Sequence, residues 1–369
     1  MRFSLAVTVA ALIATGQGHQ NGCSRPTSPY SFRPIDNVSD VAETVEGFPL
    51  VYDFNTSNSR AANATNSWWV SAFLHGSDDH EYLVLSHITD VTVVSYYRGS
   101  IFDITDKTYV QFGNLSTAPT LYSNSHNGAF NVSIDNSFYF GATLPGNATK
   151  QLRTSSAVQG VQYDLTFDLS TPVLLNTGLG GYFEFGSYQT VEWSMPAGRT
   201  TGTLVRNGTT VTIDSDESFT WYDRQWNVQT GSSGSMPNWT WFELHLNQAS
   251  QKREDRVSLW VYDDEKTGRR QWATVQPEGG LNVVSAVRSF ESYGNTWTSS
   301  NTNNTYAQNW LVTLQDGTQL DISSVYADQE VGYPTTFVSY EGFVTVSGKS
   351  ASGECVSGYG LVEVNPPSN

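Results

Sequence analysis

The feature that most restricts the fold of this chain is a long succession of short strand-like segments. They recur from Trp68 to Val364, and clusters of Asn, Gly, Ser and Pro separate them. No segment shows helical periodicity over more than two turns. Aromatic residues make up 13% of the chain and charged residues only 15%, which is typical of β-rich proteins. We therefore predict an all-β protein.

A chain of 369 residues exceeds the size at which a single core stops growing, so two domains are expected. Each half offers enough strand-like segments for its own barrel or sandwich. The segment Trp193–Gly198 contains a proline and a glycine and reads as the joint. We predict an N-terminal β domain over residues 19–197 and a C-terminal β domain over residues 198–369.

The first residues have the pattern of a secretory signal peptide, predicted over residues 1–18. Arg2 supplies the positive charge, an apolar run follows to Ala14, and small residues offer a cleavage site. The apolar run is too short to span a bilayer. We expect a soluble, secreted protein.

The two cysteines and the glycosylation sequons agree with export. Cys23 and Cys355 are the only cysteines, and in an oxidising compartment they are expected to form one disulfide. Two unpaired buried thiols are the alternative. Nine Asn-x-Ser/Thr sequons predict glycosylation, at Asn37, Asn55, Asn63, Asn114, Asn131, Asn147, Asn207, Asn238 and Asn303.

The net charge of −16 excludes whole classes of partner. Nucleic-acid binding needs a cationic surface, and anionic membranes also attract basic segments. We therefore expect neither nucleic acid nor membrane as a partner. The abundance of tryptophan, tyrosine and phenylalanine favours a hydrophobic small molecule instead, since such sites are mostly apolar and aromatic.

The segment Trp221–Asn227 concentrates an acid, a base and three aromatic residues. A buried carboxylate and guanidinium are costly unless they are paired, so a structural Asp223–Arg224 pair is one interpretation. A catalytic patch in an aromatic cavity is the other. In a regular strand Asp223 and Arg224 point to opposite faces, so one is catalytic and the other structural unless a bulge intervenes.

Two further segments carry acids among aromatic residues. Along 239–246, Trp239, Trp241, Glu243 and His245 share one face, and the opposite face is apolar core. The polar face predicts a cavity wall, with a solvent face as the alternative. Glu184 lies between two phenylalanines, and burial would raise its pKa and suit it to donate a proton.

Several site classes are absent from the sequence. It has no phosphate-binding glycine loop, no Gly-x-Ser-x-Gly elbow and no metal-binding Cys-x-x-Cys or His-Glu-x-x-His spacing. His75 and His80 bracket two aspartates, and a solvated loop explains them better than a cation site. We expect no metal and no cofactor.

Three motifs resemble the CrtC/AttH-like family of hydroxyneurosporene synthase-like proteins: Trp221–Trp226, Ser67–Trp69 and Tyr340–Gly342 with its glycine-rich continuation. The resemblance extends from Trp68 to Val364, although Asn227 stands where the family usually has glycine. It implies two lipocalin-like β-barrel or sandwich domains, with a ligand cavity in or between them. The secreted character is most similar to kievitone hydratase and to hetero-Diels–Alderases of tropolone sesquiterpenoid pathways.

The resemblance also implies a function. We expect a secreted fungal enzyme of secondary metabolism that needs no cofactor. It would dehydrate a hydrophobic terpenoid or polyketide substrate to a quinone methide and direct an intermolecular hetero-Diels–Alder cyclisation. The alternatives are a hydratase acting on a prenyl alkene, a non-catalytic lipocalin-like carrier and a carbohydrate-active protein.

The residues assigned to these roles fall into two groups. The candidate catalytic residues are Asp223, Arg224 and Glu184. The candidate substrate-binding residues are Trp68, Trp69, Trp193, Tyr222, Trp226, Trp241, Glu243, His245 and Tyr340.

Overall fold

The computed structural model describes residues 22–366, apart from 92–93, 118–120, 123–129, 187, 229–236, 249–252, 265–266, 280 and 336. The helices within these residues are short 3-10 turns: η1 (Val41–Val45), η2 (Thr56–Asn58) and η3 (Ser215–Glu217). In this part of the chain, no helix is long and apolar enough to cross a membrane. The predicted signal peptide lies outside the described residues.

The first sheet contains fourteen strands within the described residues, and they span 64–228. Its main path runs β4-β3-β2-β1-β14-β12-β9-β8-β7-β6-β5, and β10, β11 and β13 pair with β12. The strands are β1 (Ala64–His75), β2 (Glu81–Asp90), β3 (Ser95–Asp103), β4 (Thr108–Ser116), β5 (Leu121–Tyr122), β6 (Asn131–Ile134), β7 (Phe138–Leu144), β8 (Asn147–Val158), β9 (Val161–Asp168), β10 (Leu174–Leu175), β11 (Tyr182–Phe185), β12 (Tyr188–Arg206), β13 (Thr209–Thr212) and β14 (Phe219–Val228).

The second sheet has nine strands within the described residues and spans 238–365. Its strands are β15 (Asn238–Gln248), β16 (Arg253–Asp264), β17 (Gly268–Gln276), β18 (Val283–Ser292), β21 (Asn309–Leu314), β22 (Gln319–Ser324), β23 (Glu330–Val331), β24 (Ser339–Lys349) and β25 (Cys355–Asn365). Because β22 pairs with both β21 and β24, eight of these strands close into a ring. A small separate sheet joins β19 (Thr296–Thr298) to β20 (Thr305–Ala307).

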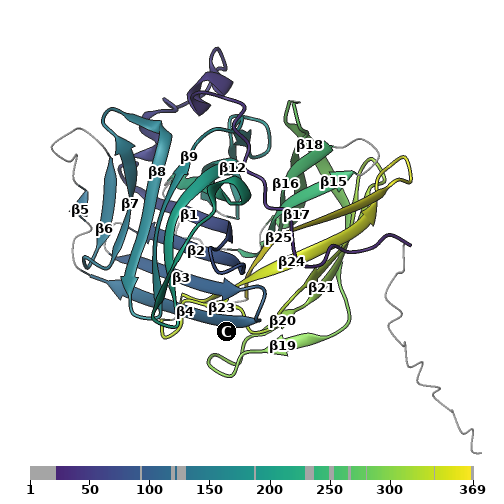
Figure 1. Cartoon of the computed structure of the whole chain (residues 1–369). Helices are drawn as coiled ribbons and strands as arrows, with labels where there is room; N and C mark the ends of the chain where they lie inside the picture. Colours follow the sequence, from purple (N-terminus) through teal and green to yellow (C-terminus); the bar gives the residue numbers. More distant parts are fainter. Residues whose placement is uncertain are drawn as a thin grey trace, which may run out of the picture.

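The two sheets form two barrels that lie side by side, with the first at the left and the second at the right (Figure 1). Alternation builds each interior, since every second residue of a strand points to the same face. In β15, for example, Phe242, Leu244 and Leu246 belong to the core of the second barrel. The prediction of an all-β fold with two lipocalin-like barrels is confirmed.

The boundary between the two sheets differs from the predicted domain boundary. β12 runs without a break through the predicted joint at residues 197–198. Its pairing with β14 shifts register between Met195 and Gly198, and this bulge accommodates Pro196 inside a strand. β14 still pairs within the first sheet, so the change of sheet falls between β14 and β15.

The predicted disulfide between Cys23 and Cys355 is confirmed, and no cysteine is free. It joins positions 332 residues apart in the sequence. The bond fixes the start of the described chain to β25, which belongs to the second barrel.

The segment that follows Cys23 ties the two barrels together. Arg25 forms an ion pair with Asp321 of β22, at 2.5 Å. Further along, Phe32 packs edge-on against Phe73 of the first barrel, at 5.7 Å, and against Tyr359 of the second, at 5.2 Å. The segment therefore contributes to a layer of aromatic residues between the barrels. We call it the aromatic layer, and its members are Phe32, Trp69, Phe73, Phe183, Phe185, Phe219, Trp221, Trp241, Trp260, Trp272, Phe343 and Tyr359.

The sequons differ in how accessible their asparagines are. Asn207 is exposed at the tip of the β12–β13 hairpin, where Asn-Gly is a favoured turn sequence. Asn238 is half-buried at the start of β15. Asn147 donates from Nδ2 to Asp40 at 2.9 Å, an interaction that a glycan on that nitrogen would disturb. Glycosylation itself stays a prediction, with Asn207 the best-placed acceptor.

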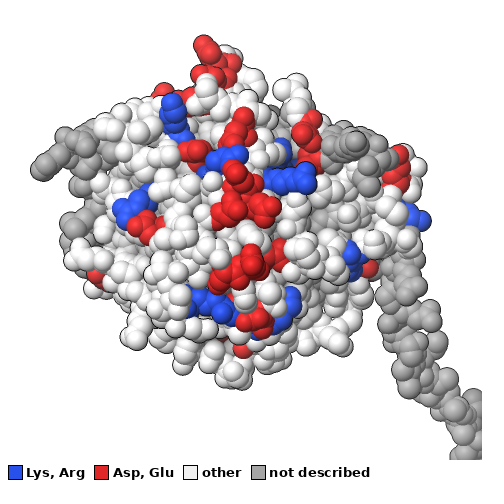
Figure 2. Space-filling model, viewed as in Figure 1, with Lys and Arg blue, Asp and Glu red and all other residues white. Residues whose placement is uncertain are grey.

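The surface charge follows the composition. Acidic residues number 35 and basic residues 19. On the face drawn in Figure 2, acidic side chains gather in a band down the middle, with basic side chains interspersed. Acidic side chains are therefore prominent on this surface, and the excess of negative charge is the reason why we predict no nucleic-acid partner.

Candidate active site

β14 separates two chemically different environments. Its neighbours in the sheet are β1 and β12, and Trp69 of β1 lies opposite Asp223. Trp221 faces the second barrel, because its ring lies 6.3 Å from the Trp241 ring and 5.7 Å from the His245 ring. Asp223 shares this face with Trp221. The alternating residues Tyr222 and Arg224 point into the first barrel instead.

We call the face of β14 that points away from the first barrel, toward the second, the outward face, and the face that enters the first barrel the inward face. Asp223 is the best-defined acid on the outward face. Its Oδ1 accepts a hydrogen bond from the Trp221 indole Nε1 at 2.8 Å. Burial raises the pKa of the Asp223 carboxyl to about 7, although hydrogen bonds from Ser194 and Trp221 oppose the shift and the charge of Glu363 adds to it. Near neutral pH this carboxyl group is thus present in both its protonated and its deprotonated form.

Four other carboxyl groups share the electrostatic environment of Asp223. Burial raises the pKa values of Glu192 and Glu243 well above the usual range, and the charge of Asp223 raises both further. The pKa of Glu341 is also raised, by burial and by the charge of Glu363. We call these five carboxyl groups the acid layer: Glu192, Asp223, Glu243, Glu341 and Glu363.

The acid layer is drawn from both barrels. Glu192 lies on β12 and Asp223 on β14 of the first barrel, whereas Glu243, Glu341 and Glu363 lie on β15, β24 and β25 of the second. Like charges this close in a poorly solvated interior cannot all ionise, so several of the carboxyls hold protons at neutral pH.

Hydrogen bonds across the interface hold the carboxyls in place. Ser71 of β1 donates to Oε1 of Glu243 at 2.5 Å. Asn176 donates from Nδ2 to Oε1 of Glu192 at 3.1 Å, and its Oδ1 accepts from Ser258 at 2.7 Å. Each of these contacts or relays connects the first barrel to the second, so the geometry of the acid layer depends on how the barrels dock.

Arg98 of β3 is the guanidinium that faces the acid layer. It lies 2.8 Å from Oε1 of Glu341 and 2.6 Å from Oε1 of Glu363. Its Nε donates to Nδ1 of His87 at 3.1 Å. Burial, and then the charge of Arg98, lower the pKa of His87 well below its usual value. His87 is therefore neutral and its Nε2 carries the hydrogen, toward Ser67 or Thr89.

The interface also contains buried polar atoms that have no hydrogen-bond partner within the described residues. Three are carboxyl oxygens, Oε2 of Glu192, Glu243 and Glu341. Further examples are Nε1 of Trp69, Trp239 and Trp272, Nε2 of Gln225 and Nε2 of His245. Unsatisfied buried polar groups are costly and rare, and they cluster where a protein binds or transforms a polar molecule.

The structure divides the predicted site residues between two environments. Five lie in or beside the acid layer: Trp69, Asp223, Trp241, Glu243 and His245. The division predicted for β15 is confirmed, since its polar face meets the first barrel and its apolar face enters the core.

The other predicted residues of the first barrel point into its interior. Trp68, Trp193, Tyr222 and Trp226 belong to the core of that barrel. Tyr222 donates its hydroxyl to Oδ1 of Asn58 at 2.8 Å, which anchors η2 over the end of the barrel.

Arg224 is fully buried in this interior and binds mostly to backbone. Its guanidinium lies 4.7 Å from the Trp68 ring and 5.0 Å from the Trp226 ring. It donates to the carbonyl oxygens of Ser57, Ser59, Ser67 and Gln225 and to Oδ1 of Asn66. Asp223 and Arg224 thus have separate sets of partners, and the interpretation as a buried ion pair between them is wrong.

Two predicted residues lie away from the acid layer. Glu184 is exposed on β11, so the burial expected for it is absent. The short strand alternates outward at this position, because Phe183 and Phe185 take the buried face. Tyr340 points into the second barrel, where it donates to Ser324 at 2.9 Å. Its sequence neighbour Glu341 faces the acid layer instead.

Sequence reasoning missed Glu192, Glu341, Glu363 and Arg98. Each acid had a detectable signal, since it alternates with apolar residues along a strand: Val191 and Trp193 flank Glu192, and Val362 and Val364 flank Glu363. Such a pattern indicates an acid on one face of a buried strand, but it does not indicate which faces meet.

The loop histidines do not form an open cation site. His80, Asp103 and Asp106 bring ligand atoms together within 4.8 Å. Arg206 forms ion pairs with both aspartates, so a guanidinium already supplies the positive charge there. His80 also contacts Asp103, with Nδ1 3.0 Å from Oδ2.

Comparisons with known proteins give relatives over nearly the whole chain. The sequence model of the AttH-like family matches residues 96–365. The chain is 33% identical to kievitone hydratase of Fusarium solani subsp. phaseoli over 369 residues, which cover 97% of each chain. It is 27% identical to dehydratase asqC of Emericella nidulans over 343 residues, 86% of this chain and 89% of that one.

A solved structure shows the same architecture. The fold is similar to that of kievitone hydratase from Nectria haematococca, with a TM-score of 0.80 and 29% identity. The similarity covers 92% of this chain and 99% of the other. The arrangement of two barrels is therefore shared over most of the chain.

Proposed function

Because the chain belongs to the AttH-like family, we propose that its acid layer adds or removes water on a hydrophobic, oxygenated small molecule. The protein is an enzyme of the hydratase and dehydratase type, as its named relatives are. The observation that carries the proposal is the gathering of five buried carboxyls, several with raised pKa values, beside unpaired indole donors.

The acid layer can supply and accept a proton in the same site. Burial raises the pKa of Glu192 well above the usual range, which favours its protonated form and suits it to donate to a leaving hydroxyl. Asp223, with a pKa of about 7, can accept a proton from elsewhere on the substrate. After one water has left, Glu192 has lost a proton and Asp223 has gained one. A single proton transfer from Asp223 to Glu192 then restores the starting state of the enzyme.

The indole donors suit an uncharged substrate that bears acceptor oxygens. Trp69 and Trp272 each have a buried N–H without a partner among the described residues. A carbonyl or phenol oxygen directed at such donors would gain charge stabilisation as the reaction proceeds. Substrates with carboxylate or phosphate groups would be repelled by the acid layer.

For the specific reaction, we propose dehydration of a phenolic benzylic alcohol to a quinone methide. A protonated carboxyl of the acid layer would protonate the benzylic hydroxyl, and a carboxylate would take the phenolic proton as water leaves. Capture of the quinone methide by an alkene then forms two bonds without loss of atoms, as a hetero-Diels–Alder reaction. The aromatic layer, in which Trp260 stacks on Trp272 at 6.2 Å, favours a flat intermediate and excludes water.

The alternative is hydration of a prenyl alkene, and the 33% identity to kievitone hydratase favours it. Here a carboxyl protonates the alkene, water attacks the resulting cation and a carboxylate removes the extra proton. A non-catalytic carrier would need the aromatic layer but gains nothing from a buried acid layer, which costs stability. A carbohydrate-active protein finds no support among the hydratase and dehydratase relatives.

One assay separates the two reactions. Purified protein is incubated with a phenolic benzylic alcohol, with and without an electron-rich alkene, and separately with a prenylated phenol in heavy-oxygen water. Dehydration with cycloaddition predicts alkene adducts formed with stereochemical preference. Hydration predicts incorporation of heavy oxygen. If the substrates bind but neither product forms, the proposed chemistry is wrong.

We also propose that the protein is secreted. The disulfide between Cys23 and Cys355 supports an oxidising compartment, because such bonds are unstable in a reducing cytosol. Recovery of the protein from the culture medium of its producer, with a glycan on Asn207, is the expected result. An unmodified Asn207 peptide from secreted material would contradict the glycosylation prediction.

A further inference from the structure

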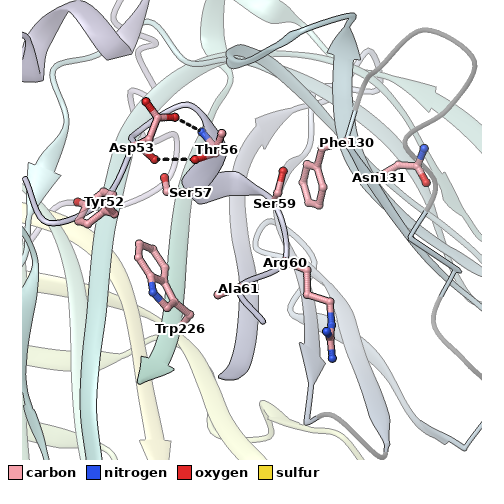
Figure 3. Close-up of a pocket in the computed structure, with 10 residues that line it drawn as sticks. All are labelled: Tyr52, Asp53, Thr56, Ser57, Ser59, Arg60, Ala61, Phe130, Asn131 and Trp226. Atoms are coloured by element: carbon pink, nitrogen blue, oxygen red, sulfur yellow. Dashed lines mark hydrogen bonds between the residues drawn. The ribbon is translucent and has the colours of Figure 1, made fainter. Parts of the chain in front are cut away.

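A cavity of about 560 Å³ lies at one end of the first barrel (Figure 3). Both charged side chains in its lining already have partners. Asp53 accepts from the backbone N–H of Thr56 at 2.8 Å. Arg60 pairs with Asp90 at 2.6 Å. The guanidinium of Arg256 on β16 differs from these groups, because it is buried and part of it has no hydrogen-bond partner within the described residues.

Arg256 lies on the face of β16 that meets the first barrel. It shares this face with Ser258, which donates to Asn176 of the first barrel at 2.7 Å. Its Nη1 donates to Oε1 of Gln276 at 3.4 Å. Its Nε lies 3.9 Å from Oε1 of Glu254, which is too far for a hydrogen bond. Nε and Nη2, which the described residues leave without an acceptor, form the edge of a guanidinium that commonly binds oxygen atoms.

His245 lies directly opposite Arg256 in the β15–β16 pair, where Cβ atoms are usually about 5 Å apart. Its Nδ1 lies 3.3 Å from Oε1 of Glu254. Burial raises the pKa of Glu254, but the hydrogen bond from His245 and the positive charges around it lower the pKa below its usual value. Glu254 is therefore a carboxylate, and Nδ1 carries the hydrogen.

The other ring nitrogen of His245 is then an acceptor. Burial and the charge of Arg256 lower the pKa of His245, so the ring is neutral and Nε2 has a lone pair. Among the described residues, Nε2 has no hydrogen-bond partner. The two opposed side chains thus present one acceptor and two donors, all unsatisfied and buried at the same place.

Aromatic rings from both barrels enclose His245. The Phe219 ring of β14 lies 4.6 Å away and the Trp221 ring 5.7 Å. The Tyr359 ring of β25 stacks on the imidazole at 5.6 Å. On the same face of β15, Glu243 of the acid layer is two residues from His245, a distance of about 7 Å along a strand. One molecule can therefore contact both places.

We propose that His245 and Arg256 form a subsite that anchors a second, phenol-type hydroxyl of the substrate, distinct from the group that reacts at the acid layer. The hydroxyl would donate to Nε2 of His245, and its oxygen would accept from Nε and Nη2 of Arg256. Proton transfer then breaks the O–H bond and forms an N–H bond on Nε2. The resulting phenolate is held by the guanidinium, and the imidazolium lies between the phenolate and Glu254.

A phenol suits this subsite better than a carboxylate or an alcohol. The carboxyl groups that act on Arg256 are Glu254, Asp255 and Glu278, and with the acid layer they would oppose the entry of an anion. An alcohol enters neutral but is too weakly acidic to give its proton to an imidazole. A phenol enters neutral as well, and the guanidinium favours its charged form once it is bound.

The subsite rests on the proposed function, since it anchors a substrate whose reacting group lies at the acid layer. Its test needs no turnover, because binding of para-nitrophenol is measured directly. If the probe binds as described but no substrate is converted, the proposed reaction is contradicted and the subsite is supported.

Nuclear magnetic resonance locates the bound probe. The intact, disulfide-bonded protein is labelled with heavy nitrogen in its histidines, and the His245 signals are identified by their loss in His245→Gln. Added para-nitrophenol should convert Nε2 of His245 from the unprotonated to the protonated form. Para-nitroanisole, which has no acidic hydrogen, should leave it unprotonated. No response at His245, or a response confined to His87 beside the acid layer, would overturn the proposal.

Matched variants test the guanidinium. Arg256→Gln should weaken binding of para-nitrophenol by about tenfold or more, measured by isothermal titration calorimetry. Arg269→Gln removes an arginine of β17 whose ion pair with Asp263 is exposed, and it should leave binding unchanged. Melting temperatures near that of the parent show that the variants fold. Arg256→Lys, which keeps the charge but loses the planar donor edge, should also weaken binding and replaces Arg256→Gln if that variant does not fold.

A variant of the acid layer separates the two places. Asp223→Asn should retain both the binding of para-nitrophenol and the response of His245, because Asp223 does not contact the proposed subsite. A loss in Asp223→Asn as large as in Arg256→Gln would place the phenol at the acid layer and overturn the proposal.

Discussion

The two faces of β14 show how the same strand supports a structural charge and a reactive one. On the inward face, Arg224 meets five hydrogen-bond acceptors and two indole rings. On the outward face, Asp223 adjoins other buried carboxyls, and its pKa is raised to about 7. A buried charge that is fully satisfied stabilises the fold, whereas carboxyls that are crowded together retain protons and can exchange them.

We expect the largest effect from replacing the carboxyl groups of Glu192 and Asp223 in the acid layer. Glu192→Gln and Asp223→Asn should each reduce turnover by about a hundredfold or more, since general acid–base groups typically contribute 10²–10⁴. Both substitutions keep the shape of the side chain and remove a costly buried carboxyl, so the melting temperature should not fall. Product formation and thermal melting are the measurements. Normal turnover in both folded variants would end the assignment of catalysis to the acid layer.

The inward face predicts the reverse outcome. Arg224→Lys keeps the charge but loses the planar array of donors, so several buried carbonyl groups would lose their partner. We expect a loss of about 3 kcal/mol in the free energy of unfolding, measured by urea denaturation. Turnover of the folded fraction should be retained.

A matched control is Arg153→Lys, whose ion pair with Asp164 is 40% and 50% exposed and should contribute little. If Arg224→Lys kept its stability but lost turnover, the guanidinium would have a catalytic role and the contrast between the faces would fail.

The pH dependence of stability should report on the Asp223 carboxyl in the absence of a substrate. The pKa of Asp223 rises from its ordinary value of 3.8 to about 7 in the folded protein, so the folded state holds more protons between these values. Stability should therefore fall as pH rises through this window. Melting temperatures across the range are expected to decrease, and Asp223→Asn should flatten the slope. A rising melting temperature over the same range would contradict the burial of these carboxyls.

The smallest expected effect is at Glu184. This carboxyl is exposed on β11 and does not belong to the acid layer, so Glu184→Gln should change stability by less than about 0.5 kcal/mol. Turnover should be unchanged as well. Glu184→Gln is the exposed-acid control for Glu192→Gln. If its loss of turnover were comparable to that of Glu192→Gln, Glu184 would again be a candidate catalytic residue.

Much of the candidate site could be predicted because alternation is a local property. The faces of β15 follow from the period of two, and the structure assigns Glu243 and Phe242 to opposite environments as expected. The separation of Asp223 from Arg224 follows from the same rule. Glu184 shows where the rule stops, since alternation gives two faces but does not say which one is covered.

The sequence by itself determined the all-β fold, the disulfide and the residues that share a face, because composition, turns and strand period are properties of neighbouring positions. Only the tertiary structure decided that β14 belongs to the first barrel and that Glu192, Glu341 and Glu363 converge on Asp223. These acids are far apart in the chain, and their pKa values depend on the docking of one barrel on the other. Docking removes water from both surfaces at once, and no single segment of sequence encodes that loss.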